Sequence, residues 1–163
     1  MTPRIENISD KKMVGMRINL TMAENREKTV QLWRSFGPRK KEIANRLSTD
    51  MFSIQIFSNN QVCDDINENT SFEKWAAVEV LDFDQIPSMM ETYILAGGLY
   101  VVFIHKGTPE TFYSTSKYIY NIWLPQSCYE IDNKRAHFDI MGKNYNPNDI
   151  NSMEEIWIPI KRN

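Results

Sequence analysis

Several segments of the sequence alternate between two kinds of side chain, as β-strands do, and one face of these segments carries both carboxylates and aromatic rings. Glu79 has the same parity as Trp75, Glu155 has the same parity as Trp157, and Asp139 lies on a third such segment. A carboxylate among aromatic rings is costly to bury alone, so it must be neutralised, paired or matched to a cation on a ligand. Aromatic faces attract a cation by roughly 0.5 to 2 kcal/mol per good contact. The pattern predicts a concave site for an apolar or cationic small molecule.

Strand alternation divides the expected sheet into a helix-facing side and a ligand-facing side. The residues expected to face the helices are aliphatic or aromatic, namely Ile54, Ile56, Val78, Val80, Phe138, Ile140, Ile156 and Ile158. The residues expected to bind the ligand are Phe57, Trp75, Glu79, Tyr100, Asp139, Met141, Glu155 and Trp157. The alternative is that the carboxylates lie on a solvated face and pair with lysine or arginine, as most strand carboxylates do.

Motifs of common enzyme classes are absent from the sequence. It contains no nucleophile elbow, Walker A loop, dinucleotide-binding glycine motif or HExxH helix. The two histidines and the two cysteines, Cys63 and Cys128, lack metal-ligand spacing, and His105 is interpreted as structural. We therefore assign no catalytic residue, no metal and no cofactor. If the protein is an enzyme, a pocket carboxylate would act as general base on water, with its pKa raised by burial.

The elements that must position these residues follow the same order in both halves of the chain. In the first half we expect a strand over 12–22, a helix from a capping box at Thr21–Glu24 to about Leu47, kinked or split at Gly37–Pro38, and strands over 52–57 and 75–81. In the second half we expect a strand over 97–107, a helix over 108–123, and strands over 136–142 and 154–160. The polar stretch 58–71 is expected to be a loop.

This order predicts an α+β fold of duplicated βαββ modules, with a concave antiparallel sheet and helices on one face. The chain of 163 residues fits one domain over 1–163, with pseudo-repeats at about 12–81 and 98–160. Its formal net charge of −2 provides no positive field for nucleic acid. Since no signal peptide or membrane-spanning run is present, we expect a cytoplasmic protein with no membrane partner. No oligomeric state is assigned.

Three strings in the second half, Gly98–Gly107, Tyr118–Glu130 and Glu155–Ile160, resemble the GyrI-like superfamily. This superfamily comprises the effector-binding domains of AraC- and MerR-type multidrug regulators and their stand-alone relatives. Weaker similarity at Arg34–Arg39 and Glu73–Val80 extends to stand-alone members, including those carried as integron gene cassettes. The resemblance implies two βαββ modules with a ligand pocket between them. It also implies binding of lipophilic, often cationic, drugs through aromatic residues and a buried acid.

By position, the resemblance implies that Asp139 is the family's buried acid, where glutamate is usual, and that Glu155 is the acid before the last strand. Cys128 stands where the family usually has glycine. The first strand is expected within about a dozen residues of the start, which leaves no room for a helix-turn-helix. We therefore expect a stand-alone small-molecule binding protein without direct nucleic-acid contact, which acts by sequestration or through a separate regulator as protein partner.

Two alternatives from the same superfamily remain open. Some GyrI-like proteins resemble hydrolases of reactive cyclopropane-containing toxins, in which a pocket glutamate would activate water. Other relatives inhibit DNA gyrase by contacting it, and the loop over 63–69, rich in Asn and Asp, is a weak version of the acidic segment that such a contact would use.

Overall fold

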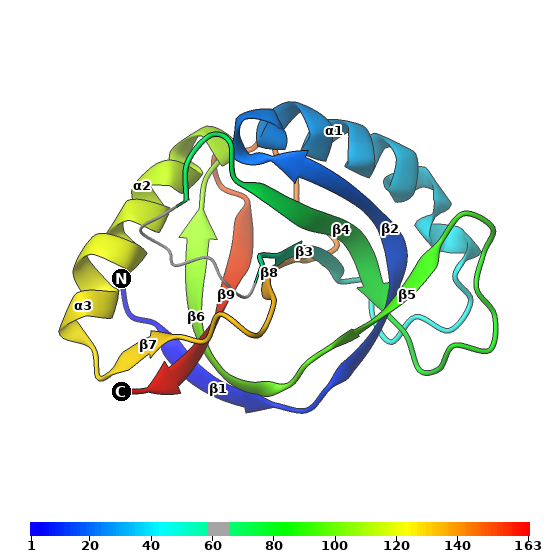
Figure 1. Cartoon of the computed structure of the whole chain (residues 1–163). Helices are drawn as coiled ribbons and strands as arrows, with labels where there is room; N and C mark the ends of the chain where they lie inside the picture. Colours follow the sequence, from blue (N-terminus) through cyan, green and yellow to red (C-terminus); the bar gives the residue numbers. More distant parts are fainter. Residues whose placement is uncertain (59–65) are drawn as a thin grey trace.

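Nine strands form a curled antiparallel sheet in the computed structural model, which describes residues 1–58 and 66–163 (Figure 1). The strands are β1 (Arg4–Ile8), β2 (Lys11–Thr21), β3 (Met51–Ile56), β4 (Ser71–Glu79), β5 (Glu91–Leu95), β6 (Gly98–Lys106), β7 (Tyr129–Ile131), β8 (His137–Met141) and β9 (Met153–Arg162). Their order across the sheet is β1-β6-β9-β8-β3-β4-β2-β5, and β7 pairs with β9. Cys63 and the start of the expected acidic loop, residues 63–65, lie outside the described residues.

The sheet closes on itself because two long chain segments pair with one another over residues 4–15 and 91–102. One segment contains β1 and β2, and the other contains β5 and β6. Arg4 lies opposite Val102 and Lys11 lies opposite Leu95, so the register is the same on both sides of the short break in each segment. At this break a Cβ atom on Gly97 would lie 2.3 Å from the carbonyl oxygen of Ile8, which is why glycine is required there. The sheet therefore has an inner face and an outer face.

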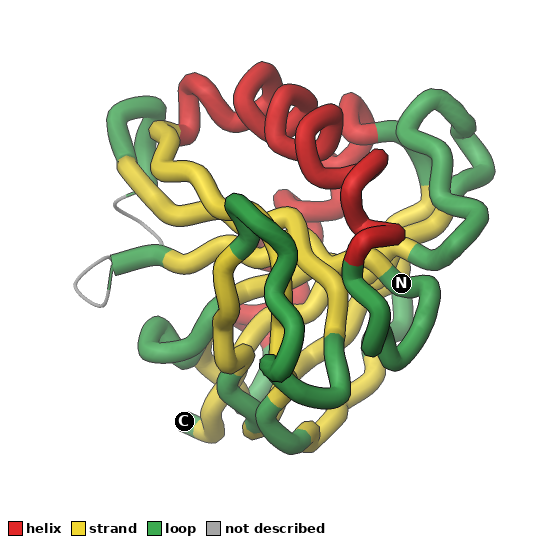
Figure 2. Tube along the Cα trace, turned by 90° about the vertical axis from the view of Figure 1, so that its right-hand side faces the viewer, coloured by secondary structure: helices red, strands yellow, loops and turns green. Residues whose placement is uncertain are grey.

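Helices cover only parts of the outer face (Figures 1 and 2). The first helical stretch consists of η1 (Met22–Glu24), α1 (Asn25–Phe36) and η2 (Gly37–Glu42). The second consists of η4 (Pro109–Thr111), α2 (Phe112–Tyr118), the π-helical turn η5 (Ile119–Trp123) and α3 (Leu124–Gln126). The capping box forms as predicted, since the backbone amide of Thr21 donates to the Glu24 carboxylate at 3.0 Å. The first α-helix is shorter than expected and changes to 3₁₀ geometry at Gly37–Pro38.

Three clusters of buried side chains hold the fold together. The α1 core joins that helix to β2 and β4 through Leu32, Phe36, Val14, Ala76, Val78 and Val80, together with Ile43 and Met90. The α2 core joins the second helical stretch to β6 and β9 through Ile119, Val101, Phe103, Ile156, Ile158 and Ile160. The inner core fills the space inside the sheet and includes Met13, Phe52, Ile54, Trp75, Leu95, Tyr100, Val102, Phe138 and Trp157. No helix among the described residues is long and apolar enough to cross a membrane.

The α+β fold class predicted from the sequence is confirmed. Both halves have the order strand, helix, strand, strand, as β2-α1-β3-β4 and β6-α2-β8-β9. The last strand of each half also repeats one contact: the indole of Trp75 donates to Glu73 at 2.8 Å, and the indole of Trp157 donates to Glu155 at 2.9 Å. The division into one domain with two pseudo-repeats stays a prediction. The sequence interpretation missed the short strands β1, β5 and β7.

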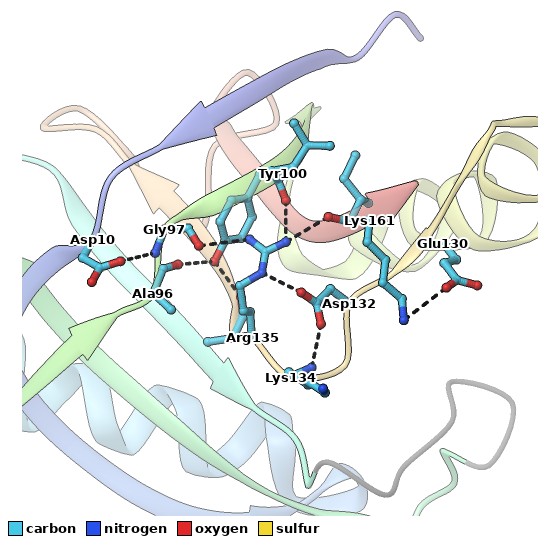
Figure 3. Close-up of polar contacts among 12 residues, drawn as sticks. Asp10, Ala96, Gly97, Tyr100, Glu130, Asp132, Lys134, Arg135 and Lys161 are labelled. Carbon is cyan, nitrogen blue, oxygen red and sulfur yellow. Dashed lines mark hydrogen bonds and ion pairs between the residues drawn. The ribbon is translucent and has the colours of Figure 1, made fainter. Parts of the chain in front are cut away.

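A guanidinium clamp at one end of the sheet orients Tyr100 (Figure 3). Arg135 is ion-paired with Asp132 at 2.8 Å and donates to the backbone carbonyls of Leu99 and Ile160 at 2.8 and 2.9 Å. The guanidinium lies 4.7 Å from the centre of the Tyr100 ring, whose hydroxyl donates to the carbonyl of Ala96 at 2.9 Å. The ring therefore points into the inner core with its polar end satisfied.

Candidate functional site

The two central strands, β3 and β8, have an outer face that neither helix core covers. The α1 core packs on β2 and β4, and the α2 core packs on β6 and β9. In the sheet order, β3 and β8 lie between these two pairs. The outer face between the helices is therefore the part of the sheet left for polar side chains.

A group of polar residues occupies this face, and we call it the inter-helix cluster. The sheet register places its members side by side: Ser53 lies opposite Asp139, Gln55 lies between Lys74 and His137, and Met141 lies opposite Glu154. Phe57 extends the cluster at one end, where its ring stacks on Phe72 at 5.2 Å and meets the edge of His137 at 5.5 Å. The cluster thus combines two carboxyl groups, one ammonium and an aromatic wall.

Hydrogen bonds link the cluster to the start of α1. The ammonium of Lys74 donates to the side-chain oxygen of Asn25, the first residue of that helix, at 3.1 Å. The Gln55 amide donates to Ser53 Oγ at 3.1 Å and to Asp139 Oδ2 at 3.4 Å. Lys74 is 7% exposed, whereas Gln55, His137, Asp139 and Glu154 are half-buried. The cluster is therefore a partly exposed surface whose charged groups are largely desolvated.

Burial shifts the ionisation of both carboxyl groups. Desolvation raises the pKa of Asp139 to about 6, against the opposing effect of the Lys74 ammonium. Desolvation also raises the pKa of Glu154 to about 8, and the negative charge of Asp139 adds to this effect while Lys74 opposes it. Near pH 7, Asp139 is therefore ionised and Glu154 holds its proton.

The other titratable groups of the cluster are shifted by the same burial. Desolvation lowers the pKa of Lys74, and the charges of Asp139 and Glu154 oppose this shift. Desolvation lowers the pKa of His137 to about 4, so its imidazole is neutral near pH 7. The pKa of Tyr145 is raised to about 12 by desolvation and by the nearby carboxylates, with Glu154 first among them. Strongly shifted groups gathered on a partly exposed face are a common property of functional sites.

The inner face is a packed aromatic core. The Phe138 ring stacks on Phe52 at 5.7 Å and on Trp157 at 5.2 Å, and the Tyr100 ring meets both Phe138 and Trp157 edge-on. Tyr100 and Phe138 are fully buried, and Trp75 is 3% exposed. A ligand could reach these rings only if they moved apart.

The structure separates the predicted ligand-binding residues into two groups. Phe57, Asp139 and Met141 lie in the inter-helix cluster, whereas Trp75, Glu79, Tyr100, Glu155 and Trp157 lie on the inner face or at its rim. At the rim, Glu79 pairs with Lys11 at 3.4 Å, and Glu155 pairs with Arg4 at 2.5 Å. These two carboxylates are therefore ion-paired, as the alternative interpretation expected.

The expected assignment of helix-facing residues is wrong for the two central strands. Ile54 and Phe138 belong to the inner core, and Ile56 and Ile140 pack against it. The expectation assumed that helices cover every strand, whereas no helix core packs on β3 or β8.

Sequence reasoning missed Lys74 and Glu154. The signal for Lys74 was its position on the strand face whose other members, Phe72, Ala76, Val78 and Val80, are all apolar. The signal for Glu154 was its position beside Glu155, because adjacent strand residues point to opposite faces.

His105 has a structural position, in line with its interpretation from the sequence. It is 1% exposed, its Nδ1 lies 2.8 Å from the Thr115 hydroxyl, and its Nε2 lies 3.2 Å from the carbonyl oxygen of Thr108. These contacts join the end of β6 to the second helical stretch. In the described part of the chain, no group of three or more His, Cys, Asp or Glu side chains gathers where it could hold a metal ion.

Comparison with known proteins gives one family and several similar folds. A family model described as the GyrI-like small molecule binding domain matches residues 1–161. A putative bacterial transcription regulation protein from Staphylococcus aureus MU50 superposes with a TM-score of 0.75 at 14% identity, over 99% of both chains. SAV2435 bound to tetraphenylphosphonium superposes with a TM-score of 0.74 at 15% identity, over 99% of this chain and 94% of that one.

An integron cassette protein from Vibrio cholerae superposes with a TM-score of 0.66 at 14% identity, over 98% of this chain and 95% of that one. No curated protein sequence matches the chain significantly. At these identities, the likeness to solved structures shows the fold.

Proposed function

This chain belongs to the GyrI-like small-molecule binding domain family, and from this premise we propose that it binds lipophilic organic cations at the inter-helix cluster. Asp139 and Glu154 are the proposed anionic anchors, and Phe57, Phe72 and Met141 are the proposed apolar contacts. One observation carries the proposal: two desolvated carboxyl groups and a buried ammonium share the partly exposed outer face around β3 and β8, with the stacked rings of Phe57 and Phe72 at one end.

The cluster has two acids and one ammonium, so with both acids ionised it can balance one further positive charge on a ligand. Lys74 compensates one carboxylate, and burial keeps the second carboxyl group, that of Glu154, protonated near pH 7. A cation placed beside Glu154 stabilises its ionised form, since an opposite charge close by lowers the pKa of an acid. Binding of the cation should therefore release a proton. The aromatic wall adds cation–π attraction and buries the apolar part of the ligand.

The tetraphenylphosphonium held by SAV2435 supports the proposal, since that protein shares this fold and its ligand is a lipophilic cation. The inner-face residues Trp75, Tyr100 and Trp157, with the rim carboxylates Glu79 and Glu155, form a second proposed location, which requires the stacked rings to separate. We propose that bound ligand is either sequestered or reported to a separate protein partner.

Isothermal titration and thermal unfolding with two ions of the same shape test the proposal. Tetraphenylphosphonium and tetraphenylborate differ in charge sign, so only the first should bind. At 100 times its Kd it should stabilise the native state by about 2.7 kcal/mol. Asp139→Asn and Glu154→Gln should each weaken binding, whereas the matched rim variants Glu79→Gln and Glu155→Gln should bind like wild type.

Equal binding of the two ions, or binding that neither cluster variant weakens, would overturn the proposal. Loss of binding in the rim variants alone would move the site to the inner face.

A further inference from the structure

We infer that Lys74 determines the charge class of the ligand: its buried ammonium balances one of the two negative charges that Asp139 and Glu154 can carry, and so restricts the inter-helix cluster to ligands with a single positive charge. This inference rests on the proposed function and deepens it.

Lys74 is held in place from two directions. Its backbone lies in β4 between β2 and β3, opposite Ile18 and Gln55. Its ammonium donates to Asn25 Oδ1 at 3.1 Å, and the same oxygen accepts a hydrogen bond from the hydroxyl of Thr29 at 3.0 Å. With 7% of its surface exposed, the side chain lies under the start of α1 rather than in solvent.

The hydrogen-bond partner of the ammonium is a neutral amide, so its charge must be balanced by groups farther away. The two carboxyl groups that interact with Lys74 electrostatically are Asp139 and Glu154. The ammonium is therefore shared between the two acids. The surface lysines Lys28 and Lys161 differ in this respect, because each forms a close ion pair with a single exposed glutamate.

The remaining charged groups near the cluster balance each other. Arg26 at the start of α1 and Glu110 in η4 form an ion pair between the two helical stretches. The negative charge of Glu110 also raises the pKa of Tyr145, as do the charges of Glu154 and Asp139. His137 is neutral near pH 7, because desolvation lowers its pKa to about 4. Asp139, Glu154 and Lys74 therefore decide the net charge.

The consequence is a limit on ligand charge. With both acids ionised and Lys74 present, one positive charge on the ligand brings the cluster to neutrality. A second positive charge would be desolvated without a partner, which is strongly unfavourable. If Lys74 were replaced by an uncharged side chain, two positive charges on the ligand would have two carboxylate partners.

Two fluorescent dyes test the inference. Ethidium and propidium share the phenanthridinium ring, and propidium has a second, quaternary ammonium on a propyl arm. We expect wild type to bind ethidium more tightly than propidium. Lys74→Met should shift the ratio of the two Kd values toward propidium by at least about tenfold, the equivalent of one pKa unit of charge interaction. The matched control is Lys11→Met, which removes a lysine paired with Glu79 at the rim of the inner face and should leave the ratio unchanged.

An unchanged ratio in Lys74→Met would overturn the inference, and so would an equal shift in Lys11→Met. If Lys74→Met does not fold, Lys74→Gln removes the charge and retains a donor for Asn25. Asp139→Asn separates the two proposals. If it weakens ethidium binding while the ratio stays constant in the Lys74 variants, only the charge-class inference fails. If it changes nothing, or if no protein binds either dye, the proposed site fails as well.

Discussion

Replacing Glu154 by glutamine should change how the stability of the protein depends on pH. In the folded protein, desolvation and the charge of Asp139 raise the pKa of this acid from 4.5 to about 8. Between these two values the unfolded chain has lost the proton and the folded chain keeps it. Folding therefore takes up a proton, and the free energy of unfolding falls as pH rises through this window.

The size of the effect follows from the two pKa values. Between pH 6 and pH 8, the proton that Glu154 takes up on folding lowers the free energy of unfolding by about 2 kcal/mol. Glutamine has no proton to exchange, so Glu154→Gln should lose about 2 kcal/mol less than wild type over this range. For a chain of this size the difference corresponds to about 4 to 8 °C in Tm.

Urea unfolding at pH 6, 7 and 8 measures the effect directly. Other titrating groups, including the two histidines, contribute to both proteins, so the difference between the two curves isolates Glu154. Glu155→Gln is the matched control, because it removes the neighbouring carboxylate, which is paired with Arg4 at the rim of the inner face. Its curve should run parallel to that of wild type. If the curve of Glu154→Gln also ran parallel to wild type, Glu154 would not hold a proton in the folded protein.

Three further outcomes follow from the same structure. Calorimetry of tetraphenylphosphonium binding at pH 7, in buffers of different ionisation enthalpy, should show release of nearly one proton by wild type and none by Glu154→Gln; equal release would exclude Glu154 as the source. Gly15→Ala should destabilise the fold by about 3 kcal/mol or more in urea unfolding, because its Cβ would lie 2.0 Å from the carbonyl oxygen of Ala76; a native-like midpoint would contradict the close approach of β2 and β4. Tyr100→Phe should cost about 1 kcal/mol, since its hydroxyl donates to Ala96; an unchanged midpoint would show that this bond contributes nothing.

Local sequence patterns predicted most of the elements but not the closure of the sheet. The capping box at Thr21–Glu24 and the break at Gly37–Pro38 are local features, and both occur as predicted. Closure instead depends on pairing between residues 4–15 and 91–102, which are far apart in the chain. Alternation shows that a strand has two different faces, and it does not show which face points inward. The prediction therefore assigned the wrong faces of β3 and β8 to the helices, although it identified the alternation of both strands correctly.

A contrast between strands could have located the inter-helix cluster. Strands β4 and β9 are apolar on both faces, as at Ala76–Val78 and Ile156–Ile158, which is typical of strands covered on two sides. Strands β3 and β8 are apolar on one face only, with Gln55 and Asp139 on the other. Because a closed sheet must fill its interior, the apolar face of such a strand points inward and its polar face points outward. In a closed sheet with helices outside, these polar positions mark the gap between the helices. In this gap Asp139 interacts electrostatically with Lys74 and Glu154.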